Sequence, residues 1–138
     1  MLSKVLEFLF QQLSSVAGAD SIYADYAPKT ASNPAIIYQL VSDAFDPMLK
    51  WQGNDRAGNI QIRIYTDSAS GGRSAANAIR EDVKNLLDLY DALDLGDGVR
   101  LSGSMVTTYI DDYDVETNHF GALCNWEFAT EANSANVP

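Results

Sequence analysis

The chain has few of the residues on which most catalytic and metal sites depend. Its 138 residues include one histidine, His119, and one cysteine, Cys124. A lone cysteine excludes an intrachain disulfide and a cysteine-rich zinc site. Catalytic triads and histidine-based metal sites need a histidine with an orienting partner, and no recognisable partner accompanies His119. The sequence therefore predicts a protein that is not an enzyme and that requires no metal or cofactor.

Positive charge is also scarce in this chain. Nine lysines and arginines stand against nineteen aspartates and glutamates, which gives a net charge of −10. Because phosphate binding relies on Lys and Arg to displace counterions, this balance argues against a protein that wraps nucleic acid. Two interpretations remain open. The acidity keeps the protein soluble, or it forms a surface past which DNA moves without being held.

Long hydrophobic runs are missing as well. Polar residues such as Lys4, Glu7 and Gln11 interrupt the apolar N-terminal stretch, which indicates neither a signal peptide nor a membrane span. We therefore expect synthesis in a reducing cytoplasm. A hydrophobic fraction of 46% is that of an ordinary globular protein. The length predicts a single domain over residues 1–130, followed by a flexible polar tail over 131–138.

Helical periodicity is present in two stretches. Apolar residues recur at helical spacing over residues 2–17, and Gly18 stands where a helix C-cap is expected. The second helix is expected over 74–87, with Ser74 as its N-cap and Val83 in its buried stripe. The preceding Gly71–Ser74 lacks the lysine and the longer glycine loop of a Walker motif, so we interpret it as a strand-to-helix turn.

The first half of the chain also contains two clear strand patterns and one ambiguous segment. Residues 34–43 are apolar on nearly both faces, which predicts an interior strand, and residues 58–67 alternate with their isoleucines inward. Residues 19–33 lack periodicity and predict a loop. The segment 44–57 is expected to form a short strand or a projecting hairpin arm, or else a hairpin folded over the core. Its apolar residues make it a candidate interface: Phe45, Met48, Leu49 and Trp51.

Two further strands are predicted near the C-terminus. A long strand spans 99–112, bent or bulged at Gly103, with Met105 on the face of Val99 and Val106 on the opposite face. The last strand places a set of apolar residues on one face: Phe120, Ala122, Cys124, Trp126 and Phe128.

The predicted order is helix, strand, an optional strand, strand, helix, strand and strand. Because the helices separate strands that need antiparallel pairing, this order predicts an α+β fold. We expect a mostly antiparallel sheet that is covered on one face by the two helices.

The densest acidic run lies between the last two predicted strands. Alternate carboxylates can bind calcium, but the glycine and the distal glutamate of an EF-hand are missing. We interpret the run as a solvated hairpin that forms an acidic surface of a loop or a lumen: Asp111, Asp112, Asp114 and Glu116.

The stretch Pro34–Asp43 (PAIIYQLVSD) resembles the first strand of the tail-terminator, or tail-completion, proteins of long-tailed bacteriophages. Ile60–Tyr65 (IQIRIY) is similar to the central strand of that family, and Ser74–Leu87 to its second helix. Tyr109–Phe128 is similar to its closing hairpin. The resemblance extends over residues 2–128 in element order.

This resemblance implies a small α+β subunit of the virion that assembles in the host cytoplasm into a ring, usually a hexamer. The ring would cap the finished tail tube at the head–tail junction. The implied partners are further copies of the chain, the tail tube protein and the head-side connector. DNA would pass through the lumen without specific binding, and no membrane is involved.

Two other classes of protein remain open at this point. One is a neck or head-completion subunit of the connector, which shares the ring symmetry but binds on the portal side. The other is a small cytoplasmic ligand-binding or enzymatic α+β domain, because a fold alone does not determine function.

Overall fold

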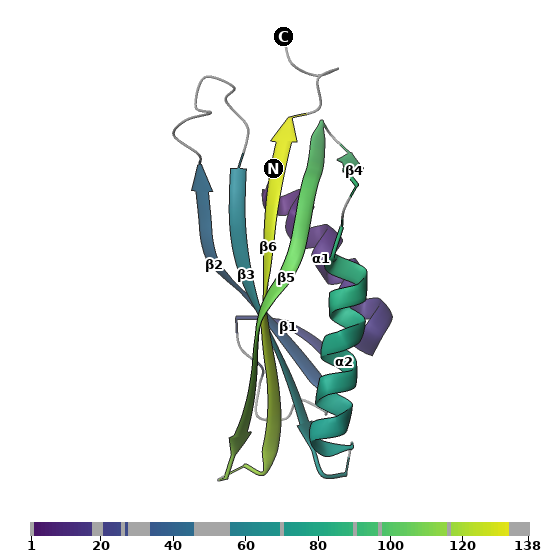
Figure 1. Cartoon of the computed structure of the whole chain (residues 1–138), viewed down its shortest axis with the longest axis vertical. Helices are drawn as coiled ribbons and strands as arrows, with labels where there is room; N and C mark the ends of the chain where they lie inside the picture. The colour runs from purple at the N-terminus through teal and green to yellow at the C-terminus, as the bar shows by residue number, and fades with distance from the viewer. Residues whose placement is uncertain are drawn as a thin grey trace.

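The computed structural model describes residues 2–17, 21–25, 27, 34–45, 56–69, 71–89, 91–96, 98–115 and 117–132. The elements follow one another along the chain as Figure 1 shows: α1 (Leu2–Ala17), β1 (Ile22–Ala24), β2 (Ala35–Phe45), β3 (Arg56–Asp67), α2 (Gly72–Leu87), β4 (Leu93–Gly96), β5 (Val99–Asp114) and β6 (His119–Ala132).

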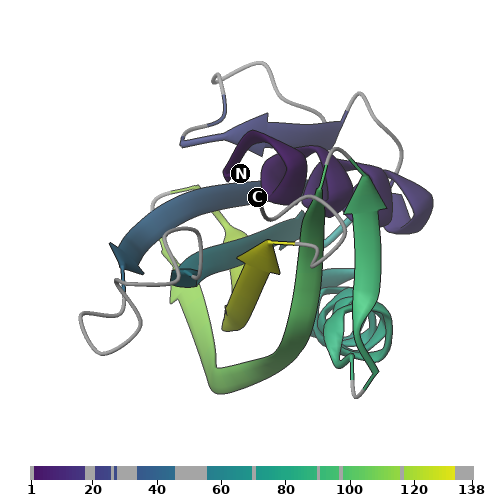
Figure 2. The ribbon, with the colours of Figure 1, turned by 90° about the horizontal axis from the view of Figure 1, so that it is seen from above.

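The strands form one six-stranded sheet in the order β1-β2-β3-β6-β5-β4. The sheet is mixed, because β1 runs parallel to β2, whereas β2–β3, β3–β6, β5–β6 and β4–β5 are antiparallel pairs. It curls around the helices, as the view in Figure 2 shows. Helix α1 accordingly contacts both edge strands, β1 and β4. The α+β class is confirmed.

The core lies between the two helices and the concave side of this sheet. Ile60, Ile62 and Ile64 of β3 are fully buried, as predicted, and the predicted apolar face of β6 packs beside them. Trp126 of β6 lies at the centre of the core. Its indole Nε1 donates a hydrogen bond to the carbonyl of Leu87 at 3.2 Å. The last turn of α2 is thereby joined to the sheet.

Helix α2 begins earlier than the sequence predicted, and the N-cap assignment of Ser74 is wrong. The N-cap residue is Gly71, whose φ of 107° is left-handed, and its cap has no side-chain hydrogen bond. Gly72 also has a positive φ, of 62°. Its carbonyl accepts a hydrogen bond from the buried Thr66 hydroxyl at 2.6 Å. Two consecutive left-handed positions favour glycine, which explains the glycine pair at this turn.

Two short edge strands are missing from the predicted order. The predicted loop over 19–33 contains β1, in which Ile22 is buried and pairs with Ile36. Strand β4, of four residues, lies between the second helix and the long strand β5, where the sequence predicted no strand. Strands of three and four residues are too short to show an alternating pattern, so periodicity could not detect them.

The predicted irregularity at Gly103 is confirmed, but the predicted faces beyond it are wrong. The β5–β6 register shifts between Leu101 and Gly103. A bulge adds one residue and thereby inverts the alternation of side chains after it. Val106 is therefore buried at 6% exposure, whereas Met105 is 55% exposed.

Several predictions fall outside the described residues. They concern the cap at Gly18, most of the segment 44–57, and the polar tail from residue 133 onward. Strand β6 continues to Ala132, two residues past the expected domain boundary at 130. Neither of the described helices has the length and apolarity needed to span a membrane.

Candidate functional site

Neither of the two described helices packs on one face of the sheet, because both lie on its other side (Figure 1). We call the helix-free side the outer face. Across it, Ile37 of β2, Arg63 of β3, Leu123 of β6 and Ile110 of β5 lie side by side in register. Antiparallel sheets commonly expose a polar face to water. This face is apolar at several positions, and Ile110 is 50% exposed.

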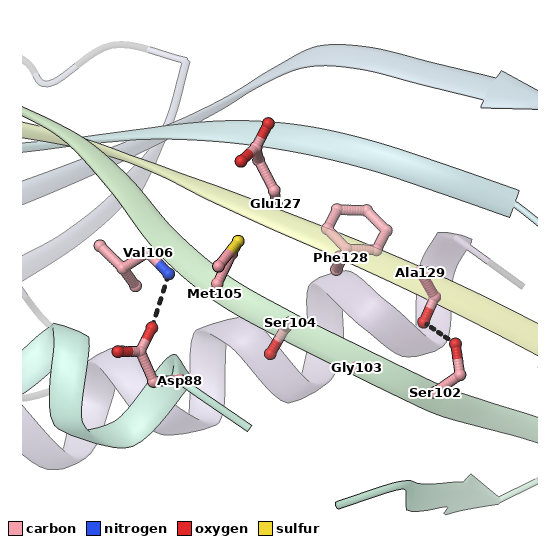
Figure 3. A pocket seen from close by; sticks show the side chains of 9 residues that line it. All are labelled: Asp88, Ser102, Gly103, Ser104, Met105, Val106, Glu127, Phe128 and Ala129. Atoms are coloured by element: carbon pink, nitrogen blue, oxygen red, sulfur yellow. Dashed lines mark hydrogen bonds between the residues drawn. The ribbon is translucent and has the colours of Figure 1, made fainter. Parts of the chain in front are cut away.

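A hollow of about 520 Å³ opens where β5 and β6 run together near Gly103 (Figure 3). Gly103 pairs with Ala129, and a Cβ atom added to Gly103 would meet no atom within 4 Å. Met105 and Phe128 also line the hollow. The lack of side-chain volume at Gly103 and Ala129 thus leaves space above the sheet.

The polar groups of this hollow already have partners within the protein. The Asp88 carboxylate accepts a hydrogen bond from the backbone N–H of Val106 at 2.6 Å and lies 3.0 Å from the Lys84 ammonium. The hydrogen bond and charge of Asp88 raise the pKa of Lys84. The Ser104 hydroxyl donates to the carbonyl of Leu87. The hollow therefore offers shape and apolar surface for contact.

The paired ends of β5 and β6, residues 110–123, form a hairpin that we call the arm. The predicted acidic surface lies on the arm, but its residues are distributed over both sides of the sheet. Asp111 pairs with Ala122 on the helix side, and its carboxylate lies 2.9 Å from the Arg80 guanidinium. Asp112 pairs with Gly121 on the outer face, and Asp114 is also exposed. Glu116 lies outside the described residues.

The predicted apolar interface is only partly described. The backbone of Phe45 pairs with Arg56 at the end of β2. Met48, Leu49 and Trp51 lie outside the described residues, so this interface stays a prediction.

Sequence reasoning missed Arg63, an exposed cation on the outer face. Its Nε donates to the Gln61 side-chain oxygen at 2.7 Å, and its Nη1 lies 3.4 Å from the Tyr65 hydroxyl. Within the described part of the chain, no carboxylate forms an ion pair with Arg63. The sequence feature that could have indicated Arg63 is a cation at an outward-facing position of a predicted strand in a strongly acidic chain.

Cys124 and His119 are both on β6. Burial raises the pKa of the Cys124 thiol to about 12, although the nearby Arg80 charge acts in the opposite direction. A protonated, buried thiol is a poor nucleophile. Among the described residues, no group of three or more His, Cys, Asp or Glu side chains is placed to hold a metal ion.

Comparison with known proteins places this arrangement in a family. No curated protein matches the chain. A chain of the virion of a native gene transfer agent particle shares the fold, with a TM-score of 0.64 and 20% identity. That match covers 90% of this chain and 92% of the other. The family model described as tail completion protein gp17 matches residues 9–131. The chain therefore belongs to the tail completion protein gp17 family and is a structural protein of the phage tail.

Proposed function

We propose that the protein assembles into a closed ring that caps the phage tail tube and joins the tail to the head-side connector. The match of residues 9–131 to the tail completion family carries this proposal. The shared fold of a chain from a gene transfer agent virion supports a role in a virion. In this proposed role the protein acts by binding other proteins rather than by catalysis.

The distribution of exposed apolar side chains supports an assembling subunit. Strand β5 and the turn that follows it carry five large apolar side chains that are at least 39% exposed. Groups of exposed apolar residues commonly mark protein interfaces. The five residues are Met105, Tyr109, Ile110, Tyr113 and Val115.

The acidity of the chain supports the passage of DNA through the ring. A net charge of −10 per subunit gives a surface that repels the phosphate backbone. A lumen lined partly by the acidic arm would not retain DNA. The proposed partners are further copies of the chain, the tail tube protein and the connector, with six copies expected in each ring.

Two measurements on the purified protein test this function. Light scattering and negative-stain electron microscopy should show closed rings. When the protein is added to tail tubes that lack it, the rings should appear at one end of each tube. A strict monomer at high concentration that does not bind tubes would contradict the proposal.

A second assay separates the tail role from the alternative neck role. Purified portal complexes are offered in place of tail tubes. Rings that bind portal complexes and ignore tubes would identify a neck or head-completion subunit instead.

A further inference from the structure

We infer that the aromatic end of one copy docks into the hollow beside Gly103 of the next copy, where Arg73 meets Glu127. The aromatic end is the exposed surface formed by Arg73, Tyr113 and Phe120. This inference rests on the proposed ring, and it specifies which two surfaces hold neighbouring subunits together. The occupant of the hollow is thus a second copy of the same chain.

The hollow combines an apolar lining with an acidic rim. Gly103 and Ala129 add little side-chain volume to it, and the Met105 side chain beside them is 55% exposed. Glu127 also lines the hollow and is exposed (Figure 3). Its carboxylate accepts a hydrogen bond from the Thr107 hydroxyl at 3.2 Å and forms no ion pair with a described residue. The hollow therefore suits an apolar side chain that has a cation next to it.

The aromatic end has both of these features. The rings of Tyr113 and Phe120 contact each other at a tilt, with centroids 4.8 Å apart, and Tyr113 is 39% exposed. Arg73 is exposed in the first turn of α2, and its Cζ lies 6.0 Å from the centroid of the Phe120 ring. Tyrosine and arginine are enriched among the residues that dominate the energy of protein interfaces. The aromatic end thus offers an apolar anchor and an adjacent cation.

The two surfaces lie on opposite sides of the sheet. Tyr113 and the first turn of α2 are on the helix side, whereas Glu127 is on the outer face. Because side chains alternate along a strand, Asp112 and Asp114 point to the outer face and away from the aromatic end. Arg63 shares the outer face with Glu127, so it cannot supply the cation of the helix side.

A single copy can use both surfaces at once. The hollow and the aromatic end lie about 33 Å apart along β5, from Gly103 to Tyr113, at roughly 3.3 Å per residue. An aromatic end therefore cannot fill the hollow of its own copy, and neither surface covers the other. Each copy gives its aromatic end to one neighbour and receives the aromatic end of the other neighbour. Such a heterologous contact produces a ring when its rotation closes.

Filling the hollow tests the contact without a change of charge. A Cβ atom at Gly103 would meet no atom within 4 Å, so Gly103→Leu has room for its side chain in the folded subunit. It should raise the concentration for half-assembly by about tenfold or more, because the added side chain excludes the aromatic end. Tyr113→Ala removes the anchor and should act in the same direction. Gly103→Ala is the matched control, because one methyl group leaves most of the hollow open.

Charge reversal tests the pairing of Arg73 with Glu127. Arg73→Glu and Glu127→Arg each place like charges against each other, which should raise the concentration for half-assembly by about tenfold or more. The double variant Arg73→Glu/Glu127→Arg should recover assembly. A mixture of the two single variants should also form rings, with the variants alternating, because every contact then joins opposite charges.

Matched controls make the same changes of net charge elsewhere. Lys4→Glu and Glu7→Arg both lie on α1, and both should assemble like the wild type. Sedimentation velocity measures assembly, and circular dichroism with thermal unfolding verifies that each variant is folded.

The outcomes separate the inferred contact from the ring itself. Wild-type rings together with full assembly of Gly103→Leu, Arg73→Glu and Glu127→Arg would overturn the contact and leave the ring standing. Equal loss of assembly in Lys4→Glu and Glu7→Arg, or no recovery in the double variant, would overturn the specific pairing. The absence of wild-type rings from solution and from tail tubes would instead contradict the proposed function, and the contact with it.

Discussion

Cys124 shows how burial changes the chemistry of a single residue. The pKa of its thiol is raised from 9.0 to about 12 by burial. The unfolded chain therefore loses this proton near pH 9, while the folded protein keeps it until about pH 12. A group whose folded pKa is raised contributes stability that is fully present below its unfolded pKa and is lost as the pH rises toward the folded value.

We predict that the free energy of unfolding falls between pH 9 and pH 12 by about 1.4 kcal/mol per pH unit through this thiol. Urea unfolding at several pH values measures the slope. Burial also raises the pKa of Tyr109, so the wild-type slope contains a contribution from that phenol. The comparison with Cys124→Ala isolates the thiol. Identical slopes for the two proteins would show that the thiol does not carry the effect.

Gly58 and Gly103 form a matched pair of glycines on neighbouring parts of the sheet. A Cβ atom at Gly58 would lie 2.3 Å from Cζ of the Phe128 ring, whereas one at Gly103 would meet nothing within 4 Å. We predict that Gly58→Ala lowers the free energy of unfolding by about 1–3 kcal/mol, because the buried ring must shift. Gly103→Ala should change it by less than about 0.5 kcal/mol. Chemical denaturation measures both, and an equal cost would refute the packing argument.

At the scale of elements, one side chain joins helix α2 to the arm. The Arg80 guanidinium donates to the carbonyl of Ile110 at 3.1 Å, pairs with Asp111 at 2.9 Å and lies 5.4 Å from the Tyr109 ring. The residues that Arg80 contacts lie at or next to the irregular part of β5, where the β5–β6 register shifts between Thr107 and Ile110. Arg80 therefore fixes the direction in which the arm leaves the irregular part of β5.

We predict that Arg80→Met lowers the free energy of unfolding by about 1–3 kcal/mol, because its side chain is only 13% exposed and its partners lose their donor. Lys84→Met is the control. It removes a more exposed ion pair with Asp88 and should lower the free energy of unfolding by less than Arg80→Met does. Hydrogen exchange should also quicken in the arm of Arg80→Met only. Unchanged exchange there would show that Arg80 does not hold the arm.

Element-scale patterns explain which parts of the fold the sequence could predict. Strands β3 and β6 were predictable because each buries one regular face over many residues, from Ile60 to Ile64 and from Ala122 to Phe128. The short strands β1 and β4 depend on pairing with distant neighbours, which no local pattern records. In β5 the position of the bulge was predictable from Gly103. Its effect on Val106 was not, because the inversion of faces depends on the register with β6.

For the whole molecule, the acidic arm was predictable because its residues are adjacent in sequence. The outer face was not predictable, because it joins residues from four strands. Ile37, Arg63, Leu123 and Ile110 become neighbours only through the strand order. Neither the hollow at Gly103 nor the pairing of Arg80 with Asp111 has a local sequence signature.

The apolar segment between β2 and β3 gives a prediction about assembly of the whole molecule. Trp51→Ala combined with Met48→Ser should weaken ring formation and leave the subunit folded, because the sequence predicts that this dense set of apolar residues forms an interface. Sedimentation reports the assembly and circular dichroism reports the fold. Unfolding of the double variant would mean that these side chains belong to the core of the subunit.

Helix α2 and the residues that follow it also protect the molecule from aggregation through the edge of its sheet. The outer edge of β5 would otherwise offer backbone groups to a passing strand, which is a known route to fibrous aggregates. Asp88 occupies the N–H of Val106, and the backbone of Leu89 pairs with that of Ser104. Strand addition at this stretch is thereby blocked, while the side chains of the arm stay exposed. The subunit can then accumulate in a crowded cell without forming amyloid-like chains through this edge.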